Sequence, residues 1–305
     1  MKLLVTGTFG LIGTRFLELN NGRFEIVALD RNDAPSEFEN TSLVKADITD
    51  SQAIEKAILE AHPAAVLHMA AYTDVNGAES NKKLAWNINV EGTKNIAKAA
   101  KKVGAKVIFL STDHTFKGNS KSYQENDQQE PINYYGQTKY EAEQALMKNG
   151  LNYLIIRLSY PYRARFEAKS DTVRWMIPKL QNGETLTLVN DQYISPTFAD
   201  DLIEVIFRLI EKGSTGVFHV AGHDCLTFYE MGQKVCEVFG FEKSLVQPIS
   251  LEEFTARTNR VARQPKLSCL NVEKAEKEIS FTMSDFEAGL RKIKEQLDNS
   301  NGGLK

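Results

Sequence analysis

The sequence opens with Met1-Lys-Leu-Leu-Val-Thr-Gly-Thr-Phe-Gly-Leu-Ile-Gly-Thr-Arg-Phe16. Residues 2–5 form a short apolar run that predicts a buried strand. Gly7, Gly10 and Gly13 follow at every third position, and the apolar residues after them predict a helix. A strand, a glycine turn and a helix in this order suit the pyrophosphate of a dinucleotide. The glycines permit close backbone approach, and the helix N-terminus offers free N–H donors.

The glycine spacing is Gly-x-x-Gly-x-x-Gly rather than the commoner Gly-x-Gly-x-x-Gly. Glycines at every third position also arise by chance in loops, but their place between a strand and a helix favours nucleotide binding. The residues expected to contact the dinucleotide in this turn are Gly7, Thr8, Phe9, Gly10, Leu11, Ile12 and Gly13.

Composition is that of an ordinary globular protein, with 42% hydrophobic and 25% charged residues and a net charge of −3. These values give no reason to expect nucleic acid as a partner. No apolar run is long enough to span a membrane, and no signal peptide is expected before the first strand, so we expect a cytoplasmic protein. Three cysteines, Cys225, Cys236 and Cys269, do not suggest a disulfide framework.

Apolar runs and amphipathic segments alternate along the first half of the chain, which predicts a Rossmann-like, doubly wound parallel α/β sheet. Expected strands are residues 2–5, 26–30, 43–47, 65–69, 106–111, 153–157 and 217–220. Expected helices are residues 51–60, 84–103, 135–148, 172–181 and 198–211. Residues 119–130 are expected to form a polar loop.

A smaller substrate lobe is expected to be interleaved with the sheet. The dinucleotide domain would comprise residues 1–160 and about 187–222, and the lobe about 161–186 and 223–297. Thr227 and Glu230 predict a capping box, and Ser284 with Glu287 predicts the start of a last helix that ends near residue 297. Residues 298–305 are expected to form a frayed tail.

Asp30 ends the second expected strand, about twenty residues after the glycine turn, where an acid can accept from the adenosine ribose. An acid here favours NAD, whereas the adjacent Arg31 could pair with the 2′-phosphate of NADP. The residues leave NADH or NADPH open, and an Asp can also simply end a strand. Other residues expected near the cofactor are Asp47, Ile48, Met69, Ala70, Ala71 and Tyr72.

The fifth strand leads into Ser111-Thr-Asp-His-Thr-Phe-Lys-Gly118, at the sheet edge where open α/β folds bind ligands. On the next helix, Tyr135 and Lys139 are four residues apart and share one face. A lysine ammonium about 4–5 Å from a phenol contributes about 3–4 kcal/mol at an effective dielectric of 20, enough to lower its pKa by about three units. Thr112 could donate to a substrate carbonyl. Tyr-x-x-x-Lys alone is also a common helical accident.

Together, these pieces resemble a known family. Gly7 to Gly13, Ser111-Thr112-Asp113 and Tyr135-x-x-x-Lys139 occur in the order found in the extended short-chain dehydrogenase/reductases. Within them, the chain is most similar to the dTDP-4-dehydrorhamnose reductases and their sugar-nucleotide relatives. Further matching pieces are Ala70-Ala-Tyr-Thr73, Asn133-Tyr-Tyr-Gly-Gln-Thr-Lys139, Asp191-Gln-Tyr-Ile-Ser-Pro-Thr197 and Ser268-Cys-Leu-Asn-Val-Glu-Lys274.

The resemblance implies an NAD(P)H-dependent reductase acting on the C4 keto group of a nucleotide-linked deoxysugar, as in dTDP-rhamnose biosynthesis. Tyr135 would donate the proton, Lys139 would lower its pKa and hold the nicotinamide ribose, and Thr112 would orient the carbonyl. Asn89 would lie near the cofactor. The residues expected to contact the sugar nucleotide are Thr73, His114, Tyr160 and Arg263. A homodimer is compatible with this interpretation, and no metal is implied.

His114 and Tyr160 depart from the tyrosine and tryptophan that many members carry there, which leaves the sugar open. His114 also occupies the position of the glutamate expected in a dehydratase. An epimerase or dehydratase, which would return the hydride, and a non-catalytic dinucleotide-binding regulatory subunit remain alternatives. His219, His223 and Cys225 are better explained by packing and turn roles than by a metal site.

Overall fold

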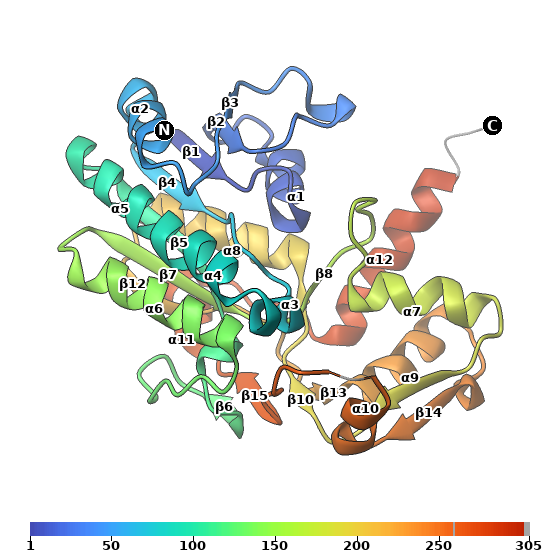
Figure 1. The fold of residues 1–305 in the computed structure, drawn as a ribbon. Coiled ribbons are helices and arrows are strands. Elements are labelled where there is room, and N and C mark those ends of the chain that lie inside the picture. Colours follow the sequence, from blue (N-terminus) through green and yellow to red (C-terminus); the bar gives the residue numbers. More distant parts are fainter. Residues whose placement is uncertain (259, 302–305) are drawn as a thin grey trace.

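The computed structural model describes residues 1–258 and 260–301. Its centre is a sheet of seven parallel strands in the spatial order β12-β7-β5-β4-β1-β2-β3 (Figure 1). These strands are β1 (Lys2–Thr6), β2 (Glu25–Asp30), β3 (Leu43–Lys45), β4 (Ala65–His68), β5 (Lys106–Thr112), β7 (Tyr153–Leu158) and β12 (Gly216–His219). The predicted doubly wound sheet is confirmed.

Helices cover both faces of the sheet, because successive strand side chains point to opposite sides. In β1, Leu3 and Val5 enter one apolar core and Leu4 enters the other. The first face carries α1 (Leu11–Asn20), α8 (Ala199–Lys212) and α11 (Glu273–Ile279). The second carries α2 (Ser51–Ala61), α5 (Gly92–Val103) and α6 (Tyr134–Lys148).

A second lobe lies to the right of the sheet in Figure 1 and has its own apolar core. It contains α7 (Thr172–Gln181), α9 (Phe228–Phe239), α10 (Leu251–Thr258), α12 (Phe286–Asn301) and the parallel pair β9 (Leu186–Val189) and β14 (Val246–Ile249). The predicted capping box of Thr227 and Glu230 starts α9. The range predicted for this lobe, about residues 223–297, also includes α11. That prediction was wrong for α11, which packs against α8 and the main sheet.

Small sheets link the two parts. One has the order β13-β10-β15-β6, formed by β13 (Leu226–Thr227), β10 (Tyr193–Ile194), β15 (Leu267–Leu270) and β6 (Asn119–Tyr123). The other pairs β8 (Pro161–Tyr162) with β11 (Thr197–Phe198). The prediction of a polar loop over residues 119–130 was therefore wrong for residues 119–123, which form β6. Pairing of β6 with the distant β15 creates this strand.

The expected helix over residues 84–103 is divided into three parts. These parts are the end of α4 (Lys82–Trp86), a π-helical segment at Asn87–Glu91, and α5. The short helix α3 (Val75–Ser80) lies before them. A π segment turns the side chains that follow it relative to a regular helix, and such segments are frequent at functional sites. Three short 3₁₀ turns lie at Ser36–Phe38, Asp113–Thr115 and Lys243–Leu245.

The last helix also differs from the prediction. Asp285, not Ser284, accepts from the Ala288 N–H at its first turn (2.7 Å). Helix α12 continues through residues 298–301. The prediction that a frayed tail starts at residue 298 was therefore wrong for these four residues. Residues 302–305 lie outside the described part of the chain.

Cys225 and Cys269 form a disulfide, with a Cα–Cα distance of 5.6 Å, although the three cysteines did not suggest a disulfide framework. The pairing arises because the small sheet brings the segment before β13 close to β15, across 44 residues of sequence. Cys236 is free and buried. His223 pairs with Glu276 (2.6 Å), and His219 Nδ1 bonds to the Tyr123 carbonyl (3.0 Å).

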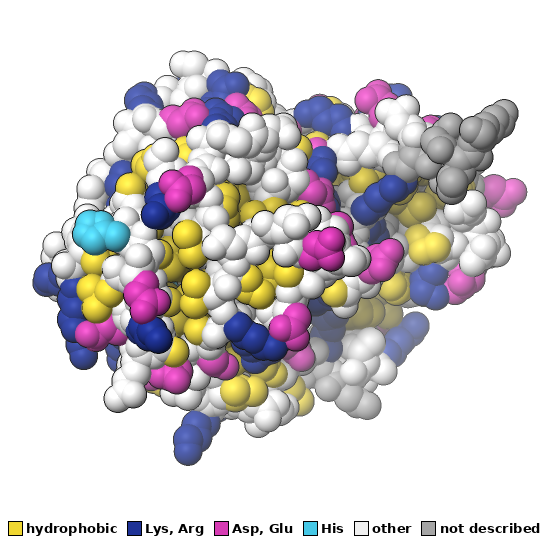
Figure 2. Space-filling model, turned by 90° about the horizontal axis from the view of Figure 1, so that it is seen from above, with side chains coloured by type: hydrophobic (Ala, Val, Ile, Leu, Met, Phe, Trp, Pro, Cys, Tyr) yellow, Lys and Arg dark blue, Asp and Glu magenta, His cyan; other side chains and the backbone are white. Residues whose placement is uncertain are grey.

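One face of the molecule carries charges of both signs. Figure 2 shows the face seen from above, where basic and acidic side chains are interspersed, in keeping with the small net charge. Within residues 1–258 and 260–301, no helix combines the length and apolar character needed to cross a bilayer.

Candidate active site

The glycine turn joins β1 to α1 at the carboxyl end of the sheet. Gly7 has φ of +67°, and a Cβ there would lie 2.6 Å from the Ala70 nitrogen. A Cβ on Gly13 would lie 2.3 Å from the Thr8 carbonyl oxygen. Both positions therefore require glycine, for the left-handed backbone at Gly7 and for close packing at both. Helix α1 starts at Leu11, with Gly10 as its N-cap, so free N–H groups face the turn.

Asp30 holds this turn in place. Its two carboxylate oxygens accept from the Phe9 and Asn32 backbone N–H groups, each at 3.0 Å, and its side chain is buried. The adjacent Arg31 is exposed. The carboxylate thus connects β2 to the glycine turn, whereas the guanidinium extends from the same edge into solvent.

Asp47 and Ile48 follow β3 but have local partners. Asp47 accepts from the Thr49 N–H and hydroxyl, both at 2.8 Å. Ile48 is buried against Gly92 of α5, where an added Cβ would lie 2.7 Å from its side chain. Ile48 is therefore part of the core beneath the sheet edge.

Residues 69–72 continue β4 past the glycine turn, and Asn89 fixes them. The Asn89 Oδ1 accepts from the Tyr72 N–H (2.8 Å), and its Nδ2 donates to the Tyr72 carbonyl (3.1 Å) and the Thr138 hydroxyl (2.9 Å). Thr138 in turn donates to the carbonyl of Tyr135 (2.8 Å). Both amide hydrogens of Asn89 donate to acceptors of the protein itself. Asn89 therefore acts as a clamp that connects residues 69–72 to α6.

Buried His68 supports the same edge. Its ring nitrogens bond to the hydroxyls of Thr6 (2.7 Å) and Thr93 (3.0 Å). Burial, with a smaller effect of Lys139, lowers the pKa of His68 to about 3. The ring is therefore neutral at physiological pH and acts as a structural connector rather than as a base.

Tyr135 and Thr112 are neighbours where β5 ends, close enough for Thr112 to lower the pKa of the Tyr135 phenol. Thr112 Oγ1 donates to Asp113 Oδ1 (3.1 Å) and accepts from the His114 N–H (3.2 Å). In this structure the Thr112 hydroxyl therefore has one protein acceptor and one protein donor.

Lys139 is buried, but its ammonium group has other partners than the phenol. Its Nζ donates to the Leu110 carbonyl (2.7 Å) and lies 3.9 Å from the centre of the Phe109 ring. Burial lowers the pKa of Lys139 to about 7, partly offset by the charge of Glu143. Lys139 therefore lies beneath the tip of β5, one helical turn from Tyr135.

The prediction that Lys139 lowers the pKa of Tyr135 does not describe this structure. Burial raises the pKa of Tyr135 well above its usual value, the bond to Thr112 lowers it, and the charge of Asp113 raises it further. The reason is that the Leu110 carbonyl competes for the lysine ammonium, whereas a carboxylate lies near the phenol.

The predicted sugar contacts divide into two groups. His114 and Tyr160 lie beside Tyr135, with the His114 ring centre 5.6 Å from that of Tyr135 and 6.3 Å from that of Tyr160. Thr73 and Arg263 are exposed. Thr73 accepts from Lys169 (3.3 Å), and the Arg263 carbonyl accepts from Asn133 (2.9 Å). The structure therefore gathers the aromatic pair around Tyr135 and places the other two residues at the surface.

Asn133 fixes the tautomer of His114. Its Oδ1 accepts from the Gly136 N–H (2.8 Å) as the N-cap of α6, so its Nδ2 must donate to His114 Nδ1 (2.9 Å). The ring hydrogen of neutral His114 is then on Nε2. Tyr160 has φ of +40°, a left-handed backbone unusual for a bulky side chain, at the point where β7 passes into the second lobe. Strained residues of this kind cluster at active sites.

Comparison with known proteins decides the family. The family described as RmlD substrate binding domain matches residues 1–299 of this chain. The chain belongs to the RmlD substrate-binding domain family. The predicted resemblance to dTDP-4-dehydrorhamnose reductases is confirmed.

Three known proteins show what this RmlD-family chain is similar to. A probable low-salt glycan biosynthesis reductase, Agl14 of Haloferax volcanii, is 32% identical over 95% of this chain and 96% of its own. The crystal structure of a dTDP-4-dehydrorhamnose reductase from Bacillus anthracis in complex with NADP is 30% identical, with a TM-score of 0.86, over 97% of this chain and 99% of its own. Methionine adenosyltransferase 2 subunit beta of Rattus norvegicus is 29% identical over 90% of this chain and 81% of its own.

Three charged residues of this family member were not predicted as site residues. Asp113 is fully buried and accepts from the hydroxyls of Thr112, Ser159 and Ser268. Glu143 and Arg157 form a buried ion pair (2.7 Å) beneath the end of β5. One signal pointed to Asp113, its place between Thr112 and His114, but nothing in the sequence indicated its burial.

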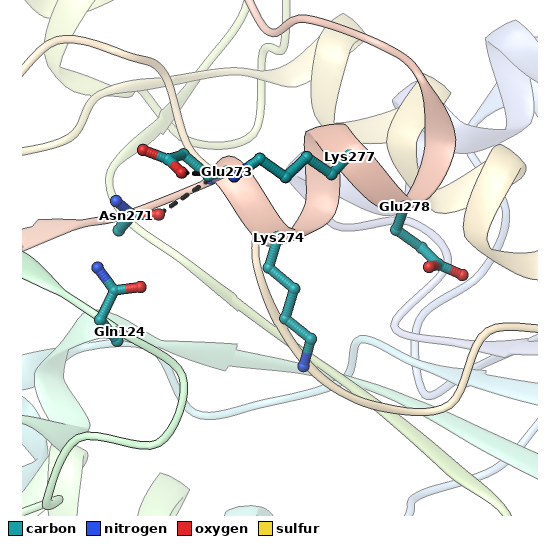
Figure 3. A pocket seen from close by; sticks show the side chains of 6 residues that line it. All are labelled: Gln124, Asn271, Glu273, Lys274, Lys277 and Glu278. Carbon is teal, nitrogen blue, oxygen red and sulfur yellow. Dashed lines mark hydrogen bonds and ion pairs between the residues drawn. The ribbon is translucent and has the colours of Figure 1, made fainter.

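A surface hollow beside α11 lies apart from these residues (Figure 3). It is lined by Gln124, Asn271, Glu273, Lys274, Lys277 and Glu278. Its lysines already have partners, because Lys277 pairs with Glu273 (2.8 Å) and Lys274 donates to the Val217 carbonyl (2.6 Å). None of the predicted site residues is among those that line it.

Proposed function

We propose that this chain uses NADPH or NADH to reduce the C4 keto group of a nucleotide-linked deoxysugar. The observation that carries the proposal is that Tyr135 lies beside Thr112 at the carboxyl end of β5 and is connected through Thr138 and Asn89 to residues 69–72, next to the glycine turn. The NADP complex of the Bacillus anthracis reductase, at 30% identity, supports the cofactor. Among such sugars, we propose the substrate of the dTDP-4-dehydrorhamnose reductases as the first one to test.

The glycine turn suits the dinucleotide because its backbone positions at Gly7 and Gly13 leave no room for a side chain. The bound cofactor would supply the hydride. The chain's part is then to bind the pyrophosphate at the start of α1, to orient the ketone beside Thr112, and to deliver the Tyr135 phenol hydrogen to the developing alkoxide. Lys139 would hold the nicotinamide ribose and offset the phenolate left behind.

The sugar nucleotide would bind between the two parts of the molecule. His114 and Tyr160, beside Tyr135, would contact the sugar, whereas the exposed Thr73 and Arg263 would contact more distant parts of the substrate. This proposal assigns the dinucleotide to residues 1–160 and about 199–222, because β9 belongs to the second lobe rather than to the predicted dinucleotide domain from about residue 187, and it assigns substrate binding mainly to that lobe. A cytoplasmic location and a homodimer remain part of the proposal.

The decisive experiment is a turnover assay. The purified chain is mixed with dTDP-4-keto-6-deoxy-L-mannose and either NADPH or NADH, and loss of absorbance at the reduced nicotinamide is followed. We expect stoichiometric oxidation of one or both cofactors. An epimerase or dehydratase gives product without net oxidation, so that outcome would replace the reductase assignment.

A second candidate is favoured by the methionine adenosyltransferase subunit among the relatives. In that case this chain would bind a dinucleotide and serve as a partner of another enzyme. Cofactor binding, measured by quenching of protein fluorescence, with no oxidation for any 4-keto sugar nucleotide would support this role. Stoichiometric turnover excludes it as the sole function.

Arg31 is expected to bind the 2′-phosphate of NADPH, because it is exposed beside Asp30, whose two oxygens already accept backbone hydrogen bonds. Arg31→Ala should raise the KM for NADPH about ten-fold or more, the effect of losing one charge-assisted bond to phosphate. The KM for NADH should change less than about two-fold. Equal effects on both cofactors would contradict this assignment.

A further inference from the structure

The Cys225–Cys269 disulfide joins two segments with different attachments. Cys225 comes directly before β13, and Cys269 lies within β15. Ser268, the residue before Cys269, donates to the buried carboxylate of Asp113 after β5 (2.8 Å). Asp224, the residue before Cys225, accepts from the first backbone N–H of α12 (3.0 Å). The disulfide therefore connects the last helix of the second lobe to the strand that contacts Asp113.

The backbone pairing between these two segments is slight. β13 and β15 are not neighbours, because β10 lies between them (Figure 1). β10 consists of Tyr193 and Ile194, which both pair with β13, and Tyr193 also pairs with Leu267 of β15. A covalent bond spans this narrow sheet and joins cysteines 44 residues apart in the sequence. Opening the bond should therefore loosen the attachment of β13 to β15.

The two sulfur atoms of this bond differ in exposure. Cys269 is 1% exposed, whereas Cys225 is half-buried. Thiol–disulfide exchange begins when a thiolate reaches one of the two sulfurs, so a small external thiol should attack at Cys225. The third cysteine, Cys236, is buried and free, which makes it an internal reference for this chemistry.

The proposed cytoplasmic location would expose this bond to reducing agents. Glutathione and thioredoxin keep most cytosolic thiols reduced, and the disulfides that form there are usually transient or redox-sensing. A disulfide that is accessible at one sulfur and that links two parts of the molecule suits such a role.

We propose that Cys225 and Cys269 form a reversible redox link, which holds the second lobe to β15 when closed and weakens binding of the sugar nucleotide when open. Small thiols such as glutathione open the link at Cys225. The effect on the sugar nucleotide rests on the proposed function, whereas the exchange chemistry is independent of it.

Opening the link takes two exchange steps. A glutathione thiolate attacks the Cys225 sulfur, the bond to Cys269 breaks, and Cys269 leaves as a thiolate that takes a proton from solvent. A second glutathione thiolate attacks the glutathione sulfur of this mixed disulfide and releases Cys225, which is protonated in the same way. Two glutathiones thus supply two electrons, the protein gains two thiols, and one glutathione disulfide forms. Glutathione disulfide closes the link by the reverse steps.

Alkylation tests the exchange chemistry. The full chain is equilibrated with glutathione or with glutathione disulfide, quenched in acid, unfolded, alkylated and weighed by mass spectrometry. We expect alkylation of Cys236 alone after glutathione disulfide and of all three cysteines after glutathione. A bond that stays closed in glutathione, or three alkylated cysteines after glutathione disulfide, would overturn the proposal.

Two single variants test the site of attack. In Cys269→Ser, the accessible Cys225 should take up one glutathione from glutathione disulfide under native conditions. In Cys225→Ser, the buried Cys269 should take up none. Equal uptake by both variants would contradict entry at Cys225. The unaltered chain tests the same point if a variant does not fold, because the mixed disulfide trapped during reduction should map to Cys225.

Turnover tests the effect on the substrate. The KM for the sugar nucleotide should be about 3- to 10-fold higher in the open form, while the dissociation constant of NADPH stays within about two-fold, because the glycine turn follows β1, outside the sheet of β13 and β15. Cys225→Ser should have the high KM in both buffers, and Cys236→Ser should respond to the buffers as the unaltered chain does. An equal KM for the open and closed forms of the unaltered chain would overturn the proposal.

The proposed function and the redox link can fail separately. If the chain oxidises no cofactor with any 4-keto sugar nucleotide, the proposed function fails, but the alkylation pattern still decides whether the link opens and closes. If the chain turns over with the same KM in both buffers, only the redox link fails.

Discussion

Tyr135→Phe should lower the turnover number for ketone reduction by about 100- to 10,000-fold, the usual contribution of a positioned proton donor. The substitution removes only the hydroxyl, so the ring still packs beside His114. The dissociation constant of the reduced dinucleotide should stay within about two-fold, because the glycine turn and Asp30 are untouched. Tyr140→Phe, on the same helix, is the matched control and should retain near-normal turnover.

The pH dependence tests the same residue in the unaltered chain. Reduction requires the phenol to carry its proton, so activity from this group is present below its pKa and is lost as pH rises through it. Because burial and Asp113 raise that pKa, the loss should occur only at strongly alkaline pH. The alkaline limb should be absent from the residual activity of Tyr135→Phe. Full activity in that variant would remove Tyr135 from the mechanism.

The sheet could be predicted because buried parallel strands appear as short apolar runs and the glycine turn marks where the first one ends. The observed strands β1, β4, β5 and β7 start at the predicted residues and end one residue away from the predicted ends. The π-helical segment Asn87–Glu91 could not be predicted, because its periodicity is close to that of a regular helix. Its Asn89 forms the clamp on Tyr72 only after the chain has folded around it.

The contacts of the predicted site residues could not be predicted. Spacing places Tyr135 and Lys139 on one helical face, but only the structure shows that the Leu110 carbonyl holds the lysine. The disulfide and the bond from Ser268 to Asp113 both depend on β15 lying next to β6 and β10, a long-range pairing that no local pattern specifies. A sequence reveals which residue types are available, whereas such pairings decide which of them meet.

Arg157→Met should have the largest effect on stability. The Arg157 and Glu143 side chains are 2% and 0% exposed, and their ion pair joins β7 to α6 next to Ser111, near the end of β5. Glu143 also accepts from the Ser111 hydroxyl and from Gln129 (2.8 Å). Removing the guanidinium leaves a carboxylate buried without its cation, so the free energy of unfolding should fall by about 3–5 kcal/mol.

Urea unfolding of the variants would measure this loss, and the double variant Arg157→Met with Glu143→Leu decides its cause. If the cost comes from the uncompensated charge, the second substitution should restore more than half of the lost stability, because an apolar pair of similar volume often replaces a buried ion pair with little penalty. Arg291→Met, which breaks the exposed pair with Glu287 on α12, should cost no more than about 0.5 kcal/mol. If the two losses in the free energy of unfolding are strictly additive in the double variant, packing around Arg157, rather than its charge, stabilises this part of the protein.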